Sequence, residues 1–174
     1  MSEQGRRILI APVEGEPGDR IQAWRLAHDP EQAKRYPPHL TLCYDPPIAD
    51  TPEALAALER QVRHAFASPV PIRLGGVAQF GDGHRTLYVR ALQTEALDEA
   101  RLRLFDGTHL AFPPLRPWPW HVSCLRNAAH APFDLIDEAR AALDFDVSQE
   151  VGAVEYRELR GQTYEVIARW DARG

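Results

Sequence analysis

The sequence is poor in cysteine, in positive charge and in long apolar runs, and each scarcity excludes a class of protein. Its 174 residues include only two cysteines, Cys43 and Cys124, which are too few for a disulfide framework and lack metal-ligand spacing. No apolar run approaches membrane-spanning length, and the first residues lack the basic and apolar regions of a secretory signal. These absences predict a cytoplasmic protein without membrane association.

The formal net charge of -5 argues against a protein that coats nucleic acid through its overall field, and favours a small or short substrate. A local basic pocket stays open, because all basic residues except Lys34 are arginine, which suits bidentate contacts to phosphate. This arginine bias also fits a GC-rich genome and therefore carries little weight. The arginines that can converge on such a pocket are Arg73, Arg85, Arg90, Arg116 and Arg126.

The most informative feature is a four-residue pattern that occurs twice, as His39-Leu40-Thr41-Leu42 and as His121-Val122-Ser123-Cys124. Alternation of apolar and polar residues is typical of a strand with two different faces. On such a strand the histidine and the hydroxyl residue point the same way, about 7 Å apart. Two facing strands of this kind would supply two imidazoles and two hydroxyls to one cleft.

The two halves of the chain repeat the same order of elements around these motifs. Each half is expected to run strand, helix, proline-rich approach, motif strand, helix, strand. Besides the motif strands, the patterns predict strands near 6–12, 71–80, 86–92, 151–160 and 162–171, with turns at Gly81–Gly83 and Gly161. They predict helices starting near Pro17, Thr51, Thr94 and Pro132. A length of 174 residues fits one duplicated, pseudo-two-fold body.

Two histidines across a phosphodiester can divide acid–base catalysis between them, because imidazole gains and loses a proton near neutral pH. One takes a proton from the attacking water and the other gives one to the departing oxygen, each contributing roughly 10²–10⁴-fold. The two hydroxyls can hold the non-bridging oxygens, so the reaction needs no metal. A single His-x-Thr is more often structural than catalytic, but two copies at matching places in duplicated halves are a specific signal.

On these motifs the chain resembles the two-histidine (2H) phosphoesterase superfamily, in its branch of RNA 2′,3′-cyclic phosphodiesterases, also called 2′-5′ RNA ligase-like proteins. The resemblance covers essentially the whole chain. It implies a duplicated bilobal α+β fold, with two antiparallel sheets and flanking helices around a central cleft. We therefore expect a single domain over 1–174 with lobes of roughly 1–82 and 83–174, and leave open whether the lobes exchange strands.

The resemblance also implies metal-independent opening of 2′,3′-cyclic phosphates on nucleotides or RNA 3′ ends, typically to a 2′-phosphate. It implies no cofactor, and no obligate protein partner is evident. By motif position, His39 and His121 match the catalytic histidines, while Thr41 and Ser123 match the phosphate-holding hydroxyls. Arg126 matches an arginine that contacts phosphate or the RNA end, although simple alternation puts it on the face opposite His121. Which histidine is acid and which is base stays open.

Five further residues are candidates for a substrate wall: Cys43, Tyr44, Tyr88, Arg90 and Trp118. Cys43 shares parity with His39, and a small wall residue is favoured over a nucleophile there. Tyr44 and Trp118 are able to stack a base. Tyr88 and Arg90 share a strand face, but the sequence does not decide whether that face is buried.

Two alternatives to this activity remain. One is a non-catalytic nucleotide- or RNA-binding module, against which the retention of all four motif residues weighs. The other is a 2H enzyme that acts on 2′-5′ linkages or on ADP-ribose cyclic phosphate, with reversible 2′-5′ RNA ligation included in what the resemblance implies.

Overall fold

The structure is a computed structural model that describes residues 5–81, 85–106, 119–126, 128, 131 and 133–172. The strands in these ranges are β1 (Arg7–Pro12), β2 (His39–Tyr44), β3 (Pro71–Gln79), β4 (Leu87–Leu92), β5 (His121–Leu125), β6 (Val147–Glu150), β7 (Ala153–Arg160) and β8 (Thr163–Asp171). The helices are α1 (Gly15–His28), α2 (Pro30–Arg35), α3 (Pro52–Ala65), α4 (Glu95–Phe105) and α5 (Phe133–Ala142).

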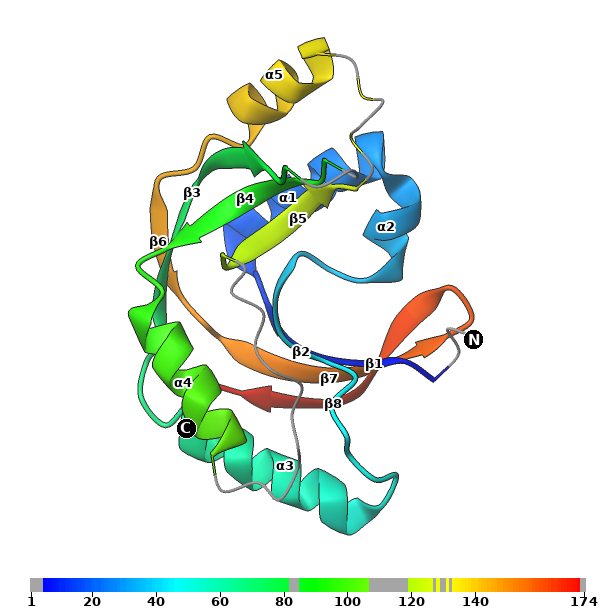
Figure 1. The fold of residues 1–174 in the computed structure, drawn as a ribbon, viewed down its shortest axis with the longest axis vertical. Coiled ribbons are helices and arrows are strands. Elements are labelled where there is room, and N and C mark those ends of the chain that lie inside the picture. The colour runs from blue at the N-terminus through cyan, green and yellow to red at the C-terminus, as the bar shows by residue number, and fades with distance from the viewer. Residues whose placement is uncertain are drawn as a thin grey trace.

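The strands form two four-stranded antiparallel sheets, one in the order β2-β1-β7-β8 and the other in the order β5-β4-β3-β6. Figure 1 shows the two sheets curling together into a half-barrel, with α3 and α4 side by side at one end and α5 at the other. The expected α+β architecture of two antiparallel sheets with flanking helices is confirmed. Each sheet takes strands from both halves of the chain, because β7 and β8 pair beside β1, while β3 pairs beside β4.

One main apolar core joins both sheets to the helices. It includes Leu40 and Tyr156 from the first sheet, Val122 from the second, and Leu58 and Leu97 from α3 and α4. A smaller cluster lies on the opposite face of the first sheet and consists of Ile8, Ile10, Tyr36, Leu159 and Tyr164. The two clusters therefore mark the two faces of the first sheet, which matters for the position of the motif residues.

Local sequence signals account for most element boundaries. Thr51 caps α3, where its side-chain oxygen accepts a hydrogen bond from the Ala54 N–H at 3.2 Å, and Pro52 occupies the first helical position. Gly161 has a φ of +62° and lies in the predicted turn between β7 and β8. The predicted start of α5 at Pro132 lies outside the described residues, and so do two residues of the predicted Gly81–Gly83 turn.

Two elements were not predicted from the sequence. The short helix α2 begins at Pro30, directly after Asp29, which is both the C-cap of α1 and the N-cap of α2. The strand β6 alternates half-buried and exposed residues and pairs only at the edge of its sheet, against β3. Both lack a long apolar stripe, so periodicity carries little signal for them.

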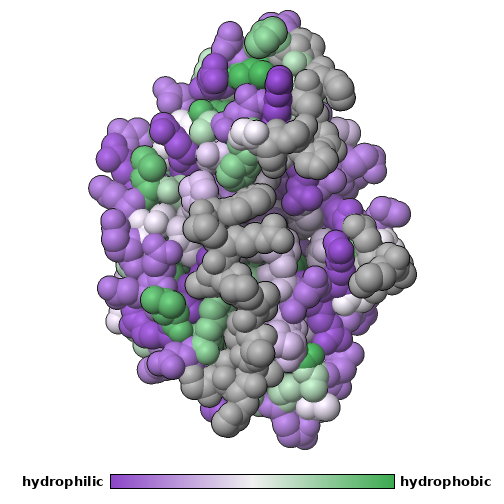
Figure 2. Space-filling view, viewed as in Figure 1, coloured by the Kyte–Doolittle hydropathy of each residue, from purple (hydrophilic) through white to green (hydrophobic). Residues whose placement is uncertain are grey.

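The surface is mainly polar on the side seen in Figure 2, where hydrophobic residues form only small separate patches among the described residues. No helix in the described ranges is both long and apolar enough to cross a bilayer.

Candidate active site

The two motif strands, β2 and β5, lie against each other although they belong to different sheets. On β2, Leu40 and Leu42 pack in the main core, which leaves His39 and Thr41 on the other face of the strand. On β5, Val122 and Cys124 pack in the same core, which leaves the histidine and serine of the second motif on the other face. The predicted alternation of both motifs is therefore present.

Each motif histidine bonds back to the carbonyl of a proline two residues earlier. His39 Nδ1 lies 2.7 Å from the Pro37 oxygen, and His121 Nδ1 lies 2.8 Å from the Pro119 oxygen. Because a carbonyl oxygen only accepts, Nδ1 carries the proton in each neutral ring, and Nε2 keeps a lone pair. The prolines that precede both motifs thus set the same tautomer and the same ring orientation twice.

An aromatic ring stands edge-on to each histidine. The Tyr36 ring centre lies 4.8 Å from that of His39 at 88°, and the Phe80 ring centre lies 4.8 Å from that of His121 at 86°. Phe80 also stacks on Tyr88, at 4.1 Å between ring centres. Sequence reasoning did not single out Tyr36 or Phe80, because neither belongs to a repeated motif and only the tertiary structure brings each to its histidine.

Both histidines are held neutral by their surroundings. Burial lowers the pKa of His39 to about 3, with the hydrogen bond to Pro37 opposing this shift and Arg25 and Arg126 adding to it. Burial also lowers the pKa of His121, opposed by the bond to Pro119, and Arg126 lowers it further. The positive charge of Arg126 thus disfavours protonation of both rings.

A β-bulge occupies the same place in both motifs. On β2, Thr41 pairs with Ile10 and Cys43 with Leu9, so Leu42 is an extra residue in the ladder. On β5, Ser123 pairs with Tyr88 and Leu125 with Leu87, so Cys124 is the extra residue. Each bulge therefore falls on the fourth residue of its motif and inverts the alternation of faces beyond it.

The bulges move two residues away from the faces expected of them. Cys43, expected on the face of His39 from its parity, lies in the main core instead, beside the bulge. Burial raises the pKa of its thiol to about 11, so the group is protonated at neutral pH. Arg126, expected on the face opposite His121, follows the second bulge just after β5 ends at Leu125, and is turned toward the motif side.

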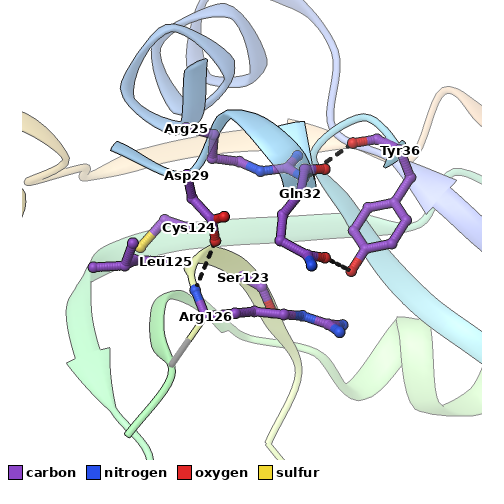
Figure 3. Close-up of a pocket in the computed structure, with 8 residues that line it drawn as sticks. All are labelled: Arg25, Asp29, Gln32, Tyr36, Ser123, Cys124, Leu125 and Arg126. Carbon is purple, nitrogen blue, oxygen red and sulfur yellow. Dashed lines mark hydrogen bonds between the residues drawn. The ribbon is translucent and has the colours of Figure 1, made fainter. Parts of the chain in front are cut away.

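Arg126 is anchored by a residue from the other half of the chain. Its backbone N–H donates to Asp29 Oδ2 at 3.0 Å, and its guanidinium carbon lies 5.6 Å from the centre of the Tyr36 ring. Figure 3 shows Arg126 and Ser123 facing the α1–α2 segment across a small pocket. The residues that line this pocket are Arg25, Asp29, Gln32, Tyr36, Ser123, Cys124, Leu125 and Arg126.

Arg25 holds the α1–α2 side of this pocket in place. It is 2% exposed, and its guanidinium donates to the backbone oxygens of Gln32 at 2.7 Å and Tyr36 at 3.0 Å. The Tyr36 hydroxyl in turn donates to Gln32 Oε1 at 2.9 Å. These bonds fix the ring that stands edge-on to His39, so Arg25 supports the site without belonging to either motif.

Two of the remaining candidates for a substrate wall, Tyr88 and Arg90, lie next to the second motif on β4. Tyr88 and Arg90 pair with Ser123 and His121, and because Leu87 and Val89 are in the core, both lie on the motif side of the second sheet. Arg90 Nε donates to the Gly76 oxygen at 3.3 Å, toward β3.

Other candidates lie at the edge of the site or outside it. Tyr44 ends β2 and is exposed, whereas Arg73 on β3 of the second sheet forms a side-chain ion pair with Asp146. Trp118 and Arg116 lie outside the described residues. No group of three potential metal ligands occurs in the part of the chain that the structure describes.

Comparisons with known proteins agree with this arrangement. The profile of the 2′-5′ RNA ligase superfamily matches residues 13–162, so the chain belongs to this superfamily of 2H phosphoesterases. No curated protein matches the chain by sequence. Membership supports an activity of the phosphoesterase or RNA ligase type, and the family resemblance read from the two motifs is confirmed.

Several solved structures share the fold. A phosphoesterase crystal structure has a TM-score of 0.63 at 18% identity, covering 98% of this chain and 99% of its own. The protein TT0787 of Thermus thermophilus has a TM-score of 0.59 at 20% identity, covering 97% and 98%. E. coli LigT complexed with NADP+ has a TM-score of 0.55 at 18% identity, covering 96% and 97%, and LigT was also solved with ATP and with 3′-AMP.

Proposed function

We propose that the protein is a metal-independent phosphodiesterase that opens 2′,3′-cyclic phosphates of nucleotides or RNA 3′ ends. The observation that carries this proposal is the matched setting of His39 and His121 on two strands that lie against each other, each with Nδ1 bonded to a proline carbonyl and an aromatic ring edge-on. Two unprotonated Nε2 atoms suit a reaction that passes protons on both sides of an anionic phosphorus centre.

In this reaction Nε2 of one neutral histidine takes a proton from water while the water oxygen bonds to phosphorus. The other histidine, protonated, gives its proton to the departing ribose oxygen as the phosphorus–oxygen bond breaks, which leaves a phosphate monoester, expected on O2′. The negative charge of the bound phosphodiester stabilises an imidazolium, so substrate binding raises the pKa of the ring that acts as the acid. Depressed pKa values in the free protein keep the base ready to accept a proton.

The hydroxyls and the arginine hold the phosphate in this scheme. Thr41 and Ser123 donate to the non-bridging oxygens, as their positions beside the histidines on β2 and β5 favour. Arg126 adds a charge-assisted contact, supported by the anchoring of its backbone to Asp29. The nucleotides bound to E. coli LigT support a small nucleotide as the ligand class.

The proposal is tested by assaying the protein with 2′,3′-cyclic AMP, with an oligonucleotide that ends in a cyclic phosphate, with ADP-ribose cyclic phosphate and with a 2′-5′ linked dinucleotide. We expect turnover of the first two substrates, unchanged by EDTA, with a 2′-phosphate product identified by ³¹P NMR. Turnover of only the latter two would assign a different substrate to the same site. Binding of 3′-AMP by a folded protein that turns over none of the four would identify a binding module and overturn the proposal.

A further inference from the structure

We propose that Arg90 binds a second phosphate of the substrate, one ribose away from the phosphate that is cleaved, so that the preferred ligand carries a phosphate on O5′ as well as a cyclic phosphate. The inference deepens the proposed function and rests on the same site. It follows from three observations: the place of Arg90 beside the second motif, a β-bulge of two glycines opposite it, and a guanidinium that has no ion pair in the described part of the chain.

Arg90 is the cross-strand neighbour of His121. The two residues lie opposite each other where β4 pairs with β5, and Figure 1 shows β4 between β5 and β3. Side chains opposite each other on one face of an antiparallel pair have Cβ atoms about 4.5–5.5 Å apart. Because Val89 and Ala91 on either side belong to the main core, Arg90 lies on the motif side. A ligand held at His121 is therefore within reach of the Arg90 side chain.

The guanidinium of Arg90 is directed one strand away from the second motif. Its Nε donates to the Gly76 oxygen at 3.3 Å, on β3, which pairs with the edge of β4 opposite β5. In the proposed reaction the contact to the cleaved phosphate falls to Arg126, which directly follows β5. Arg90 is thus placed for a neighbouring phosphate of the same ligand and not for the phosphate that reacts.

A β-bulge in β3 makes room for this guanidinium. The register between β3 and β4 shifts between Leu74 and Val77, so that Gly75 and Gly76 together oppose Arg90. A side chain at Gly76 would lie against the guanidinium, since a Cβ there would be 3.7 Å from Arg90 Nη2. Glycine inside a strand often marks a place where a ligand approaches the backbone closely. The bulge therefore leaves the guanidinium beside bare backbone, next to the second motif.

The charge of Arg90 has no carboxylate partner within the described ranges. Arg90 is exposed and forms no ion pair there, whereas Arg73, on the same face of the second sheet, is paired with Asp146. The carboxylate of Asp144 lies beside the glycines, 3.2 Å from the place of a Cβ on Gly76, without ion-pairing with Arg90. An exposed arginine in this state keeps donors for an anion, and its planar fork suits a phosphate.

The corresponding neighbour in the first motif is a buried proline. His39 lies opposite Pro12 on β1. Proline carries no charge and has no N–H to donate. The second phosphate is therefore expected on the His121 side of the cleaved phosphate, over β4 and β3, which gives the ligand one direction in the site.

Two kinds of ligand carry a phosphate at this position. In RNA it is the phosphodiester that joins the last nucleotide to the rest of the strand, and in a mononucleotide it is a phosphate monoester. Both place an anionic phosphate on O5′ of the ribose that bears the cyclic phosphate. The chemistry that Arg90 recognises is the same, and substrates of the two kinds separate the sources.

The test measures binding of 3′-AMP and of adenosine 3′,5′-bisphosphate by calorimetry. The two ligands share base, ribose and 3′-phosphate, so the ratio of their affinities reports the second phosphate. We expect the wild type to bind the bisphosphate about 3- to 15-fold more tightly, between the effects of an exposed ion pair and of a charged hydrogen bond. Arg90→Ala should bring this ratio close to one, Arg90→Lys should keep most of it, and Arg90→Glu should invert it.

Arg73→Ala is the matched control. It removes an arginine from the same face with the same change in net charge, but one whose charge Asp146 already neutralises. It should keep the wild-type ratio, and added salt should lower the ratio in both proteins and not in Arg90→Ala. Equal affinity of the wild type for the two ligands, no binding of either, a ratio that persists in Arg90→Ala, or an equal loss in Arg73→Ala would each overturn the inference.

Kinetics identify the source of the second phosphate and separate the inference from the proposed function. KM is measured for 2′,3′-cyclic AMP, for its 5′-phosphorylated form and for a dinucleotide that ends in a cyclic phosphate. A lower KM that Arg90→Ala abolishes assigns the RNA phosphodiester if only the dinucleotide shows it, and the monoester if only the 5′-phosphorylated form does. Equal KM values for all three in an active enzyme would overturn the inference. A bisphosphate preference that depends on Arg90, without any turnover, would instead overturn the proposed reaction and leave this phosphate site in place.

Discussion

The two motif regions are alike within the motif and differ just beyond it. Each histidine donates Nδ1–H to a proline carbonyl, each has an aromatic ring edge-on at 4.8 Å, and each motif ends in a β-bulge. His39 is 9% exposed, and the fifth residue after it is Tyr44. His121 is half-buried, and the fifth residue after it is Arg126. The shared features set ring orientation and tautomer, and the differences set the surroundings of each ring.

This comparison teaches that duplication preserves what proton transfer requires and varies what recognition requires. An imidazole can act at phosphorus only if its Nε2 is presented in a fixed direction, which the proline carbonyl and the perpendicular ring provide on both sides. The fifth residue after each histidine, Tyr44 in the first motif and Arg126 in the second, lies outside this shared setting of the rings and differs between the two sides. Substitutions of the shared motif residues and of Arg126 can test this comparison, and their expected effects on activity differ widely in size.

Removing either imidazole should be the most damaging change. His39→Ala and His121→Ala should each lower kcat/KM for 2′,3′-cyclic AMP by roughly 10²–10⁴-fold, because each supplies one proton transfer. The double variant should lose little more, since groups that act as a unit are not additive. His64→Ala, on the exposed side of α3, is the control and should retain wild-type activity. Full activity in either single variant would remove that histidine from the reaction.

Removing one hydroxyl should cost somewhat less. Thr41→Val and Ser123→Ala should each lower kcat by roughly 10²-fold, as expected for loss of one donor to a charged oxygen. Thr41→Ser and Ser123→Thr keep the donor and should stay within a few-fold of wild type. Steady-state kinetics check this, and equal activity of the conservative and non-conservative variants would show that the hydroxyls do not touch the phosphate.

Removing the arginine should cost about 10- to 100-fold in kcat/KM, because a hydrogen bond from a charged donor is lost. Arg126→Lys should recover part of this, since lysine keeps the charge but not the bidentate geometry. Asp29→Ala should have a smaller effect of the same kind, because it releases the Arg126 backbone and leaves the guanidinium. Arg140→Ala, on the surface of α5, is the control. An Arg126→Ala variant as active as this control would place Arg126 outside the site.

The burial difference between the histidines should appear in the dependence of stability on pH. The folded pKa of His39 is about 3, below the usual value of 6.5, so the unfolded chain binds more protons between these pH values. The free energy of unfolding should therefore fall as pH drops from 6.5 toward 3, by up to about 1.4 kcal/mol per pH unit for this residue.

Urea unfolding between pH 4 and pH 7 measures this dependence. His39→Gln should flatten it, because glutamine does not titrate, and His121→Gln should flatten it as well, since the pKa of His121 is also lowered by burial. Carboxylates contribute in the same pH range, so the comparison is between each variant and the wild type. An unchanged slope in His39→Gln would show that folding does not lower the pKa of this ring.

Most of the fold could be predicted because its signals are local. The apolar stripe of α3, its cap at Thr51 and the alternation in β2 and β5 depend on residues close in sequence, so periodicity finds them. The helix α2 and the strand β6 could not be found in this way. Their formation depends on the packing of α1 beside α2 and on the free edge of β3, which are properties of the assembled sheets.

By itself, the sequence determined the family, the alternation of the two motifs and the prolines that precede them, because these depend on short-range pattern. Only the tertiary structure decided which residues surround the histidines. The bulges at Leu42 and Cys124 arise from pairing with neighbouring strands, and they turn Cys43 into the core and Arg126 toward the site. Alternation along one strand cannot reveal this, because a bulge is defined by two strands together.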